Sequence, residues 1–168
     1  MTLNIKEQIL SITIEIAQKE LSKTKNIDGL LLYKLKRRLE KKCGECGYVL
    51  ENSLSIVNRT HGKIRSVDNR SVLQYDINYK VKTINPFKDE RYTCIVDSIT
   101  KMGFISYLRL NEEDTIKETP LLVIIPKDYI PDNLFEKVQK GAEINVKILD
   151  SRMKHLSENI QSVGTMID

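Results

Sequence analysis

Cations and aromatic residues recur together in the second half of the chain, in a pattern that could hold a single-stranded nucleic acid. The set comprises Lys101, Phe104, Tyr107, Arg109, Lys147 and Arg152. Small β-barrels bind single strands through a cationic groove and through aromatic rings on which bases stack, each stacked base contributing about 1–3 kcal/mol. For Phe104 a place in the barrel core is an equally weighted alternative.

Other reactive residue types form no recognisable constellation. There is no Ser/His/Asp set, no glycine-rich phosphate loop and no carboxylate cluster at a defined spacing, so the sequence gives no support for an enzyme. Cys43 and Cys46 have zinc-knuckle spacing, but tetrahedral zinc needs four ligands. The remaining candidates, Cys94, His61 and His155, are scattered over both halves. We therefore expect a buried structural Cys43 and no metal or other cofactor.

Composition and charge narrow the class of protein. The 168 residues are 40% hydrophobic and 30% charged, which is ordinary for a folded soluble chain. No apolar run approaches the roughly 20 residues of a membrane span, no secretory signal is visible, and three cysteines fit a reducing compartment. The net charge is +4, and residues 23–42 contain eight Lys or Arg against two Asp or Glu. This basic stretch could touch nucleic acid, but a solvated helix face is the favoured interpretation.

The first half predicts a small sheet with one main helix. Strict alternation of apolar and polar residues from Leu73 to Val81 indicates a long, half-buried strand. Further strands are predicted at 8–17, 48–57 and 63–67, with a tight turn at Asp68-Asn69-Arg70. Between them, residues 27–42 have helical periodicity. The order is β-α-β-β-β.

The second half predicts a small barrel. Pro86 cannot donate to a strand ladder, so it marks a join between two modules, 1–85 and 86–168. Strands are predicted at 92–99, 103–109, 121–125, 144–149 and 159–166, with a helical piece within 126–138. Five short strands with a helical turn after the third are the order of an OB-type barrel. We expect Phe87, next to Pro86, to be buried at the domain interface.

Four motifs in register resemble a known family. They are Cys43 with Gly47-Tyr48-Val49, the join Pro86-Phe87-Lys88-Asp89-Glu90, the turn Thr100-Lys101-Met102-Gly103, and the final Val163-Gly164-Thr165. From about Leu39 onward the chain resembles the stalk subunit of multisubunit RNA polymerases. That family comprises the seventh subunit of RNA polymerase II, its archaeal counterpart, and the small stalk-like subunit of large DNA viruses.

The resemblance implies a fold and a function. The fold is α+β: an RNP-like tip domain with a small antiparallel sheet and one main helix, followed by a five-stranded S1-type OB barrel. The function is that of a non-catalytic polymerase subunit in transcription, whose tip docks on the core subunits and whose barrel contacts nascent RNA. The expected docking loop contains Gly62, Lys63, Arg65, Asp68, Asn69 and Arg70. A companion stalk subunit is left open.

Departures from the family pattern keep alternatives open. Asp89 stands where the family often has glycine, and Ile105 where many S1 domains have an exposed aromatic residue. The loop 111–119 is long and acidic, which would oppose an RNA strand. A free-standing S1-type RNA-binding protein in translation or RNA turnover is the alternative function. The high content of Ile and Lys favours a large DNA virus as the source of the sequence. A viral protein would be found in the host cytoplasm and the virion, whereas a cellular one would be nuclear.

Overall fold

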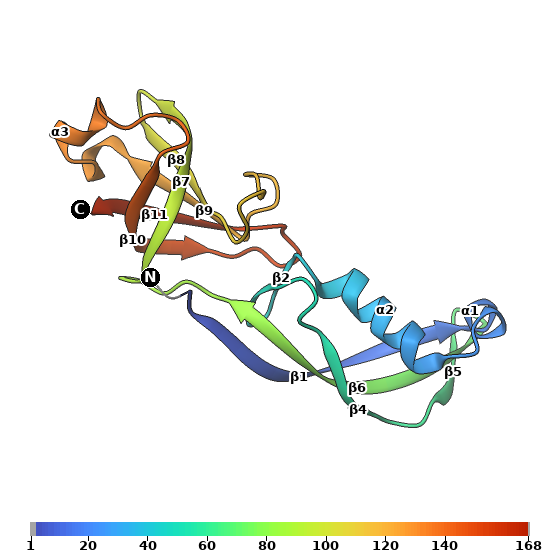
Figure 1. The fold of residues 1–168 in the computed structure, drawn as a ribbon. Helices are drawn as coiled ribbons and strands as arrows, with labels where there is room; N and C mark the ends of the chain where they lie inside the picture. Colours follow the sequence, from blue (N-terminus) through green and yellow to red (C-terminus); the bar gives the residue numbers. More distant parts are fainter. Residues whose placement is uncertain (1–2, 168) are drawn as a thin grey trace. The chain divides into compact units, whose positions relative to one another are not determined.

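The computed structural model describes residues 3–167, which divide into two compact units (Figure 1). The tip unit consists of Lys6–Glu40 and Val49–Thr83. The barrel unit consists of residues 3–5, Lys41–Tyr48 and 84–167. The predicted division between residues 85 and 86 stays a prediction, and the short segment Lys41–Tyr48 groups with the barrel. No helix within residues 3–167 is both long and apolar enough to cross a membrane.

The tip unit is built on one long strand, β6 (Arg70–Ile84). Four other strands pair with it: β1 (Ile5–Ala17), β3 (Gly47–Val49), β4 (Ser55–Arg59) and β5 (Lys63–Val67). The predicted alternation is confirmed, because Tyr75, Ile77, Tyr79 and Val81 are all buried. These side chains form the floor of the tip core.

Helix α2 (Ile27–Leu39) packs its apolar stripe against this floor, with Leu31 and Leu35 fully buried. It begins at Asn26, whose side chain accepts a hydrogen bond from the Gly29 N–H at 3.0 Å and so caps the helix. The helix ends at Leu39 rather than at the predicted residue 42, because Glu40 is extended and Lys41 has a φ of +57°. A short helix, α1 (Gln18–Lys23), was not predicted.

The barrel unit contains a closed five-stranded barrel, as predicted. Its strands are β7 (Arg91–Thr100), β8 (Gly103–Leu108), β9 (Leu121–Pro126), β10 (Glu143–Arg152) and β11 (Ile160–Ile167). They pair around the ring in the order β10-β11-β9-β8-β7, with β11 and β9 parallel and the other pairs antiparallel. The predicted helical piece consists of η1 (Lys127–Tyr129) and α3 (Asp132–Phe135). The α+β class with an OB-type barrel is therefore confirmed.

The short strands β2 (Cys43–Gly44) and β3 (Gly47–Val49) form a hairpin between α2 and β4. Cys43 explains why residues 41–48 group with the barrel. Its N–H donates to the Ser157 carbonyl at 2.8 Å, and its carbonyl accepts from the Leu156 N–H at 2.9 Å. This pair of backbone bonds ties the hairpin to the loop between β10 and β11.

The turn that follows Pro86 is held by its backbone and by one carboxylate. Asp89 has a φ of +70°, a conformation that Asp tolerates better than most residues and that glycine adopts freely. Its N–H donates to the Ile148 carbonyl at 2.8 Å, and the Glu90 carboxylate accepts from the Phe87 N–H at 3.1 Å. Pro86 is buried, but Phe87 is 45% exposed. The expected burial of Phe87 is therefore not found, since close to half of its side chain is exposed.

Gly103, in the turn between β7 and β8, offers a test of barrel closure. Its φ is +139°, and a Cβ there would lie 2.1 Å from the Ile125 carbonyl oxygen of β9. Gly141 has a φ of +86° with no atom within 4 Å of the equivalent position. We expect Gly141→Ala to cost about 1–3 kcal/mol from backbone strain alone, and Gly103→Ala to cost at least about 2 kcal/mol more. Urea unfolding of both variants measures the difference, and equal losses would contradict the close approach.

Candidate docking hairpin and nucleic-acid interface

The predicted docking loop is a regular β-hairpin. Strands β5 and β6 pair antiparallel up to Val67 and Arg70, leaving Asp68 and Asn69 as a two-residue turn. Both turn residues have positive φ, +50° and +62°, which is the geometry of a type I′ turn. Asp and Asn are the side chains that accept this conformation most readily after glycine. The turn predicted from these residues is confirmed.

The outer end of this hairpin is exposed throughout. The expected docking residues all lie on it or at its base: Gly62, Lys63, Arg65, Asp68, Asn69 and Arg70. The structure adds two aliphatic residues that the sequence analysis missed, Ile64 at 79% and Val67 at 39% exposure. Arg65 and Ser66 separate them, so Ile64 and Val67 point to opposite faces of β5, and nothing in the sequence signalled that both are uncovered. Cations beside uncovered aliphatic side chains are suited to a protein partner.

The base of the hairpin is fixed by packing against Tyr75. A Cβ at Gly62 would lie 2.8 Å from the Tyr75 ring, so only glycine allows the chain to pass this close. On the same ring, the Arg59 guanidinium carbon lies 5.3 Å from the centroid, a cation–π contact. The connection from β4 to β5 is therefore pressed onto a buried aromatic residue.

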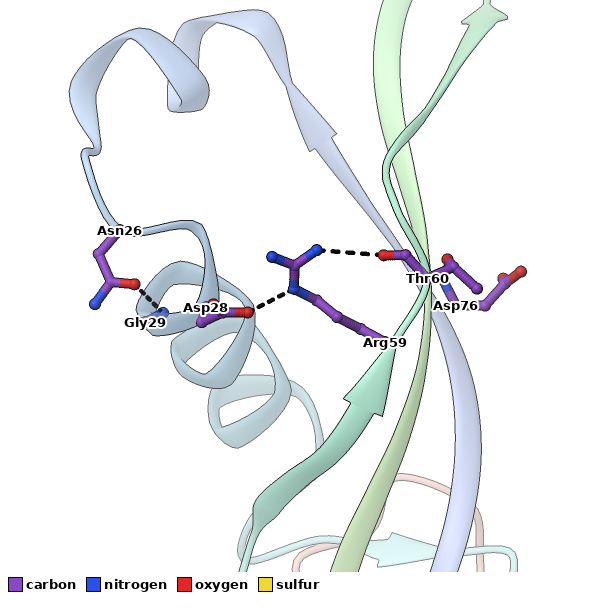
Figure 2. Close-up of polar contacts among 6 residues, drawn as sticks. All are labelled: Asn26, Asp28, Gly29, Arg59, Thr60 and Asp76. Carbon is purple, nitrogen blue, oxygen red and sulfur yellow. Dashed lines mark hydrogen bonds and ion pairs between the residues drawn. The ribbon is translucent and has the colours of Figure 1, made fainter.

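Arg59 also connects the hairpin to the start of helix α2 (Figure 2). Its Nε donates to the Asp28 carboxylate, and its Nη1 donates to the Thr60 carbonyl at 3.3 Å. The hydrogen bond from Arg59 lowers the pKa of Asp28. Thr60 is held in turn by Asp76 of β6, whose carbonyl accepts from the Thr60 N–H at 2.9 Å. Helix, connection and central strand thus share one polar network.

In the barrel, Phe104 does not have the role that the cation–aromatic pattern predicted. Its side chain is fully buried, and its ring stacks on Phe135 of α3, with centroids 5.3 Å apart and planes 5° from parallel. A ring enclosed in this way cannot offer a face to a base. The core alternative is correct, and Phe104 is withdrawn from the candidate RNA-binding residues.

Tyr107 and Arg152 lie on a shared outer surface. Directly paired residues point to the same side of a sheet, and the pairs run Arg152 with Gln161, Gln161 with Leu122, and Leu122 with Tyr107. A second row beside it contains Val163, Ile124 and Ile105. We call this surface the barrel face: Ile105, Tyr107, Leu122, Ile124, Arg152, Gln161 and Val163. Ile124 and Val163 are 45% and 37% exposed, so its centre is aliphatic rather than aromatic.

The other predicted cations have different surroundings. Lys101 is exposed in the turn that leads into β8. Arg109 follows Tyr107 by two residues and forms an ion pair with Glu143 at 3.6 Å. Lys147 lies on β10, the strand that also holds Arg152, pairs with Thr165 of β11, and forms an ion pair with Asp89 at 3.3 Å. Lys101 and Arg109 therefore lie next to the two ends of β8, whereas Lys147 lies on the far side of β11 from it and is paired with Asp89.

The acidic loop 111–119 uses part of its charge locally. Asp114 accepts a hydrogen bond from the Asn111 N–H at 2.8 Å, and Glu118 accepts one from the Thr115 N–H at 3.1 Å. The buried Thr119 hydroxyl donates to the Leu108 carbonyl at 2.6 Å and so ties the end of the loop to β8. The loop is thus a series of capped turns next to the end of the barrel face.

The cysteines are free thiols in different environments. Cys43 and Cys94 are buried, whereas Cys46 is half-buried. Burial raises the pKa of the Cys43 thiol, and it raises the pKa of Cys94 to about 12. Within residues 3–167 no group of three or more His, Cys, Asp or Glu side chains is placed to hold a metal ion.

Two curated proteins are similar to this chain over most of its length. The DNA-directed RNA polymerase II subunit RPB7 of Glycine max is 26% identical over 160 residues, covering 86% of this chain and 82% of the relative. The DNA-directed RNA polymerase II subunit 7 of Arabidopsis thaliana has the same identity and coverage. No family model matches the chain. The resemblance to this stalk-subunit family that the four motifs indicated is confirmed by these relatives.

A solved structure of an uncharacterized protein from Methanocaldococcus jannaschii is 20% identical and covers 47% of this chain and 92% of that chain. Its TM-score of 0.35 is too low to carry an argument.

Thiol reactivity tests the placement of the cysteines. Because the thiolate is the reactive form, the buried thiols with raised pKa should react slowly. We expect iodoacetamide at pH 8 to alkylate Cys46 at least about tenfold faster than Cys94, as measured by peptide mass spectrometry, and Cys46→Ser to remove the fast phase. Equal labelling of Cys94 in the folded protein would contradict its burial.

Proposed function

We propose that this chain is a non-catalytic stalk subunit of a DNA-directed RNA polymerase. The observation that carries the proposal is the likeness to two RNA polymerase II seventh subunits over 86% of the chain, which is long enough to include both units. An α+β tip followed along the chain by an OB-type barrel is the architecture that the stalk-subunit resemblance implies. Its subcellular location would be that of the polymerase it joins.

The tip unit would dock on the polymerase core through the β5–β6 hairpin. Three features support this surface: the uncovered Ile64 and Val67, the cations Lys63, Arg65 and Arg70, and the rigid base at Gly62. A two-residue turn and a base packed on Tyr75 hold the hairpin in one conformation, which reduces the entropy lost on docking. The aliphatic residues would supply affinity and the cations would guide association.

The barrel face would contact exiting RNA. Lys101, Arg109 and Arg152 surround an aliphatic centre that carries one aromatic residue, Tyr107. Such a surface neutralises phosphates without reading sequence, and a single stacking ring limits affinity. Arg109 can exchange Glu143 for a phosphate at little cost, because an exposed ion pair contributes only about 0–1 kcal/mol.

Charge reversal on the hairpin tests docking. We expect Arg65→Glu combined with Arg70→Glu to release the chain from purified polymerase at a salt concentration that wild type withstands, because like charges now face the partner. Arg152→Glu, on the barrel face, is the matched control and should be retained. The measurement is co-purification across a salt series, with circular dichroism to verify folding. If the double variant is retained as well as wild type, the docking surface lies elsewhere on the chain.

The salt dependence of RNA binding tests the barrel face. With three cations engaged, the slope of log K against log[salt] for the full chain and single-stranded RNA should be about −2, since each phosphate contact contributes about −0.7. Replacing Lys101 and Arg152 by alanine should flatten the slope by about 1.4, whereas Lys63→Ala, in the tip unit, should leave it unchanged. If the chain does not bind RNA even at low salt, the proposed RNA contact is wrong and the chain is a docking and structural subunit only. Strong RNA binding without polymerase association would favour a free-standing RNA-binding protein.

A further inference from the structure

A groove of about 680 Å³ lies within the tip unit, between strand β1 and helix α2. Thr13, Ile14 and Glu15 border it from the strand, and Leu30, Tyr33 and Arg38 are among the residues that border it from the helix. Neither the hairpin nor the barrel face contributes to it. It therefore has no part in the docking and RNA contacts proposed above.

The groove runs along the edge of a strand. Successive side chains of a strand point to opposite faces, so a cavity bordered by Thr13, Ile14 and Glu15 together must lie beside the backbone edge. Strand β1 pairs with β6, and no other strand in the part of the chain that the structure describes pairs with β1. Backbone groups along such an edge can receive an added strand. One carbonyl, that of Glu15, accepts a hydrogen bond from the Lys34 ammonium at 3.1 Å.

Side chains around the groove combine an apolar floor with positive charge. Ile14 is 4% exposed and Leu30 is half-buried, so the floor is aliphatic. Tyr33, which is 59% exposed, and the exposed Arg38 stand on the helix side. Lys34 forms a 2.6 Å ion pair with Glu20, which neutralises that carboxylate. The helix that lines this side lies in the basic stretch 23–42.

We propose that this groove binds an extended acidic segment of a partner protein, which adds to the free edge of β1 as a further strand. The edge would pair with the backbone of the segment, the aliphatic floor would take its alternate side chains, and the helix cations would attract its carboxylates. A nucleic acid fits less well. It has no backbone donors and acceptors in strand register, and the groove offers one exposed ring for stacking.

Peptide binding to the full-length chain tests this groove. The probe is a fluorescein-labelled 12-residue peptide of alternating Val and Glu, and its matched control alternates Val and Lys. We expect the acidic peptide to bind at low salt at least tenfold more tightly than the basic one, as measured by fluorescence anisotropy. Binding should also slow hydrogen exchange in residues 11–16 of β1, because an added strand protects edge amides.

Two variants on the same helix separate the groove from general charge. Arg38 borders the groove and Lys36 does not, although both lie in the last turn of α2. We expect Arg38→Glu to weaken binding of the acidic peptide at least tenfold and Lys36→Glu to change it less than twofold, with circular dichroism verifying the fold of each. Equal effects of the two variants, equal binding of the two peptides, or unchanged exchange in β1 would overturn the proposal. The proposal would also be overturned if a 12-nucleotide single-stranded RNA bound more tightly than the acidic peptide and lost affinity in Arg38→Glu but not in Lys36→Glu. None of these outcomes bears on polymerase association.

Discussion

Pairing to strand β6 is the constraint on which the tip unit depends. Strands β1, β4 and β5 all hydrogen-bond to it, and its buried side chains are the floor on which α2 packs. A one-residue slip of this strand would turn its tyrosines and aliphatic residues outward, so its register is strongly specified. Because β6 is one strand of the β5–β6 hairpin, its fixed register also fixes the position of the hairpin. The proposed docking hairpin can therefore be exposed and still keep a defined shape, since its base at Gly62 packs on a ring that β6 holds in the core.

The five-stranded barrel differs from the tip unit in having no unpaired strand edge within residues 3–167. Closure of five strands leaves no free edge, so the barrel presents side chains on its outer surface rather than unpaired backbone groups. The outer positions of β8, β9 and β11 hold aliphatic residues where a strong RNA binder would have rings, and Tyr107 is the aromatic member of that surface. The tip unit, in contrast, keeps one free strand edge in β1. The two units thus present chemically different surfaces.

Sequence reasoning worked where one short-range rule decided the outcome. Alternation predicted β6 and the barrel strands, and Asp68-Asn69 predicted the hairpin turn, because both signals lie within a few residues. It failed where the outcome depended on distant residues. Phe104 is covered by Phe135, 31 residues further along the chain, so the residues around Phe104 do not reveal its burial. Likewise, the periodicity of residues 27–42 does not reveal that helix α2 ends at Leu39. The exposure of Ile64 and Phe87 could not be predicted either, because it depends on what does not cover them. The candidate docking residues came from the family resemblance, and the structure places them along one hairpin.

Association with a polymerase is the central claim, and the most direct measurement is affinity purification of the tagged wild-type chain from its native source, followed by mass spectrometry. The account predicts that the two largest subunits of a DNA-directed RNA polymerase are recovered in amounts comparable to the chain itself, and that they are lost when the salt concentration is raised. Recovery of ribosomal or RNA-turnover proteins without those subunits would contradict it.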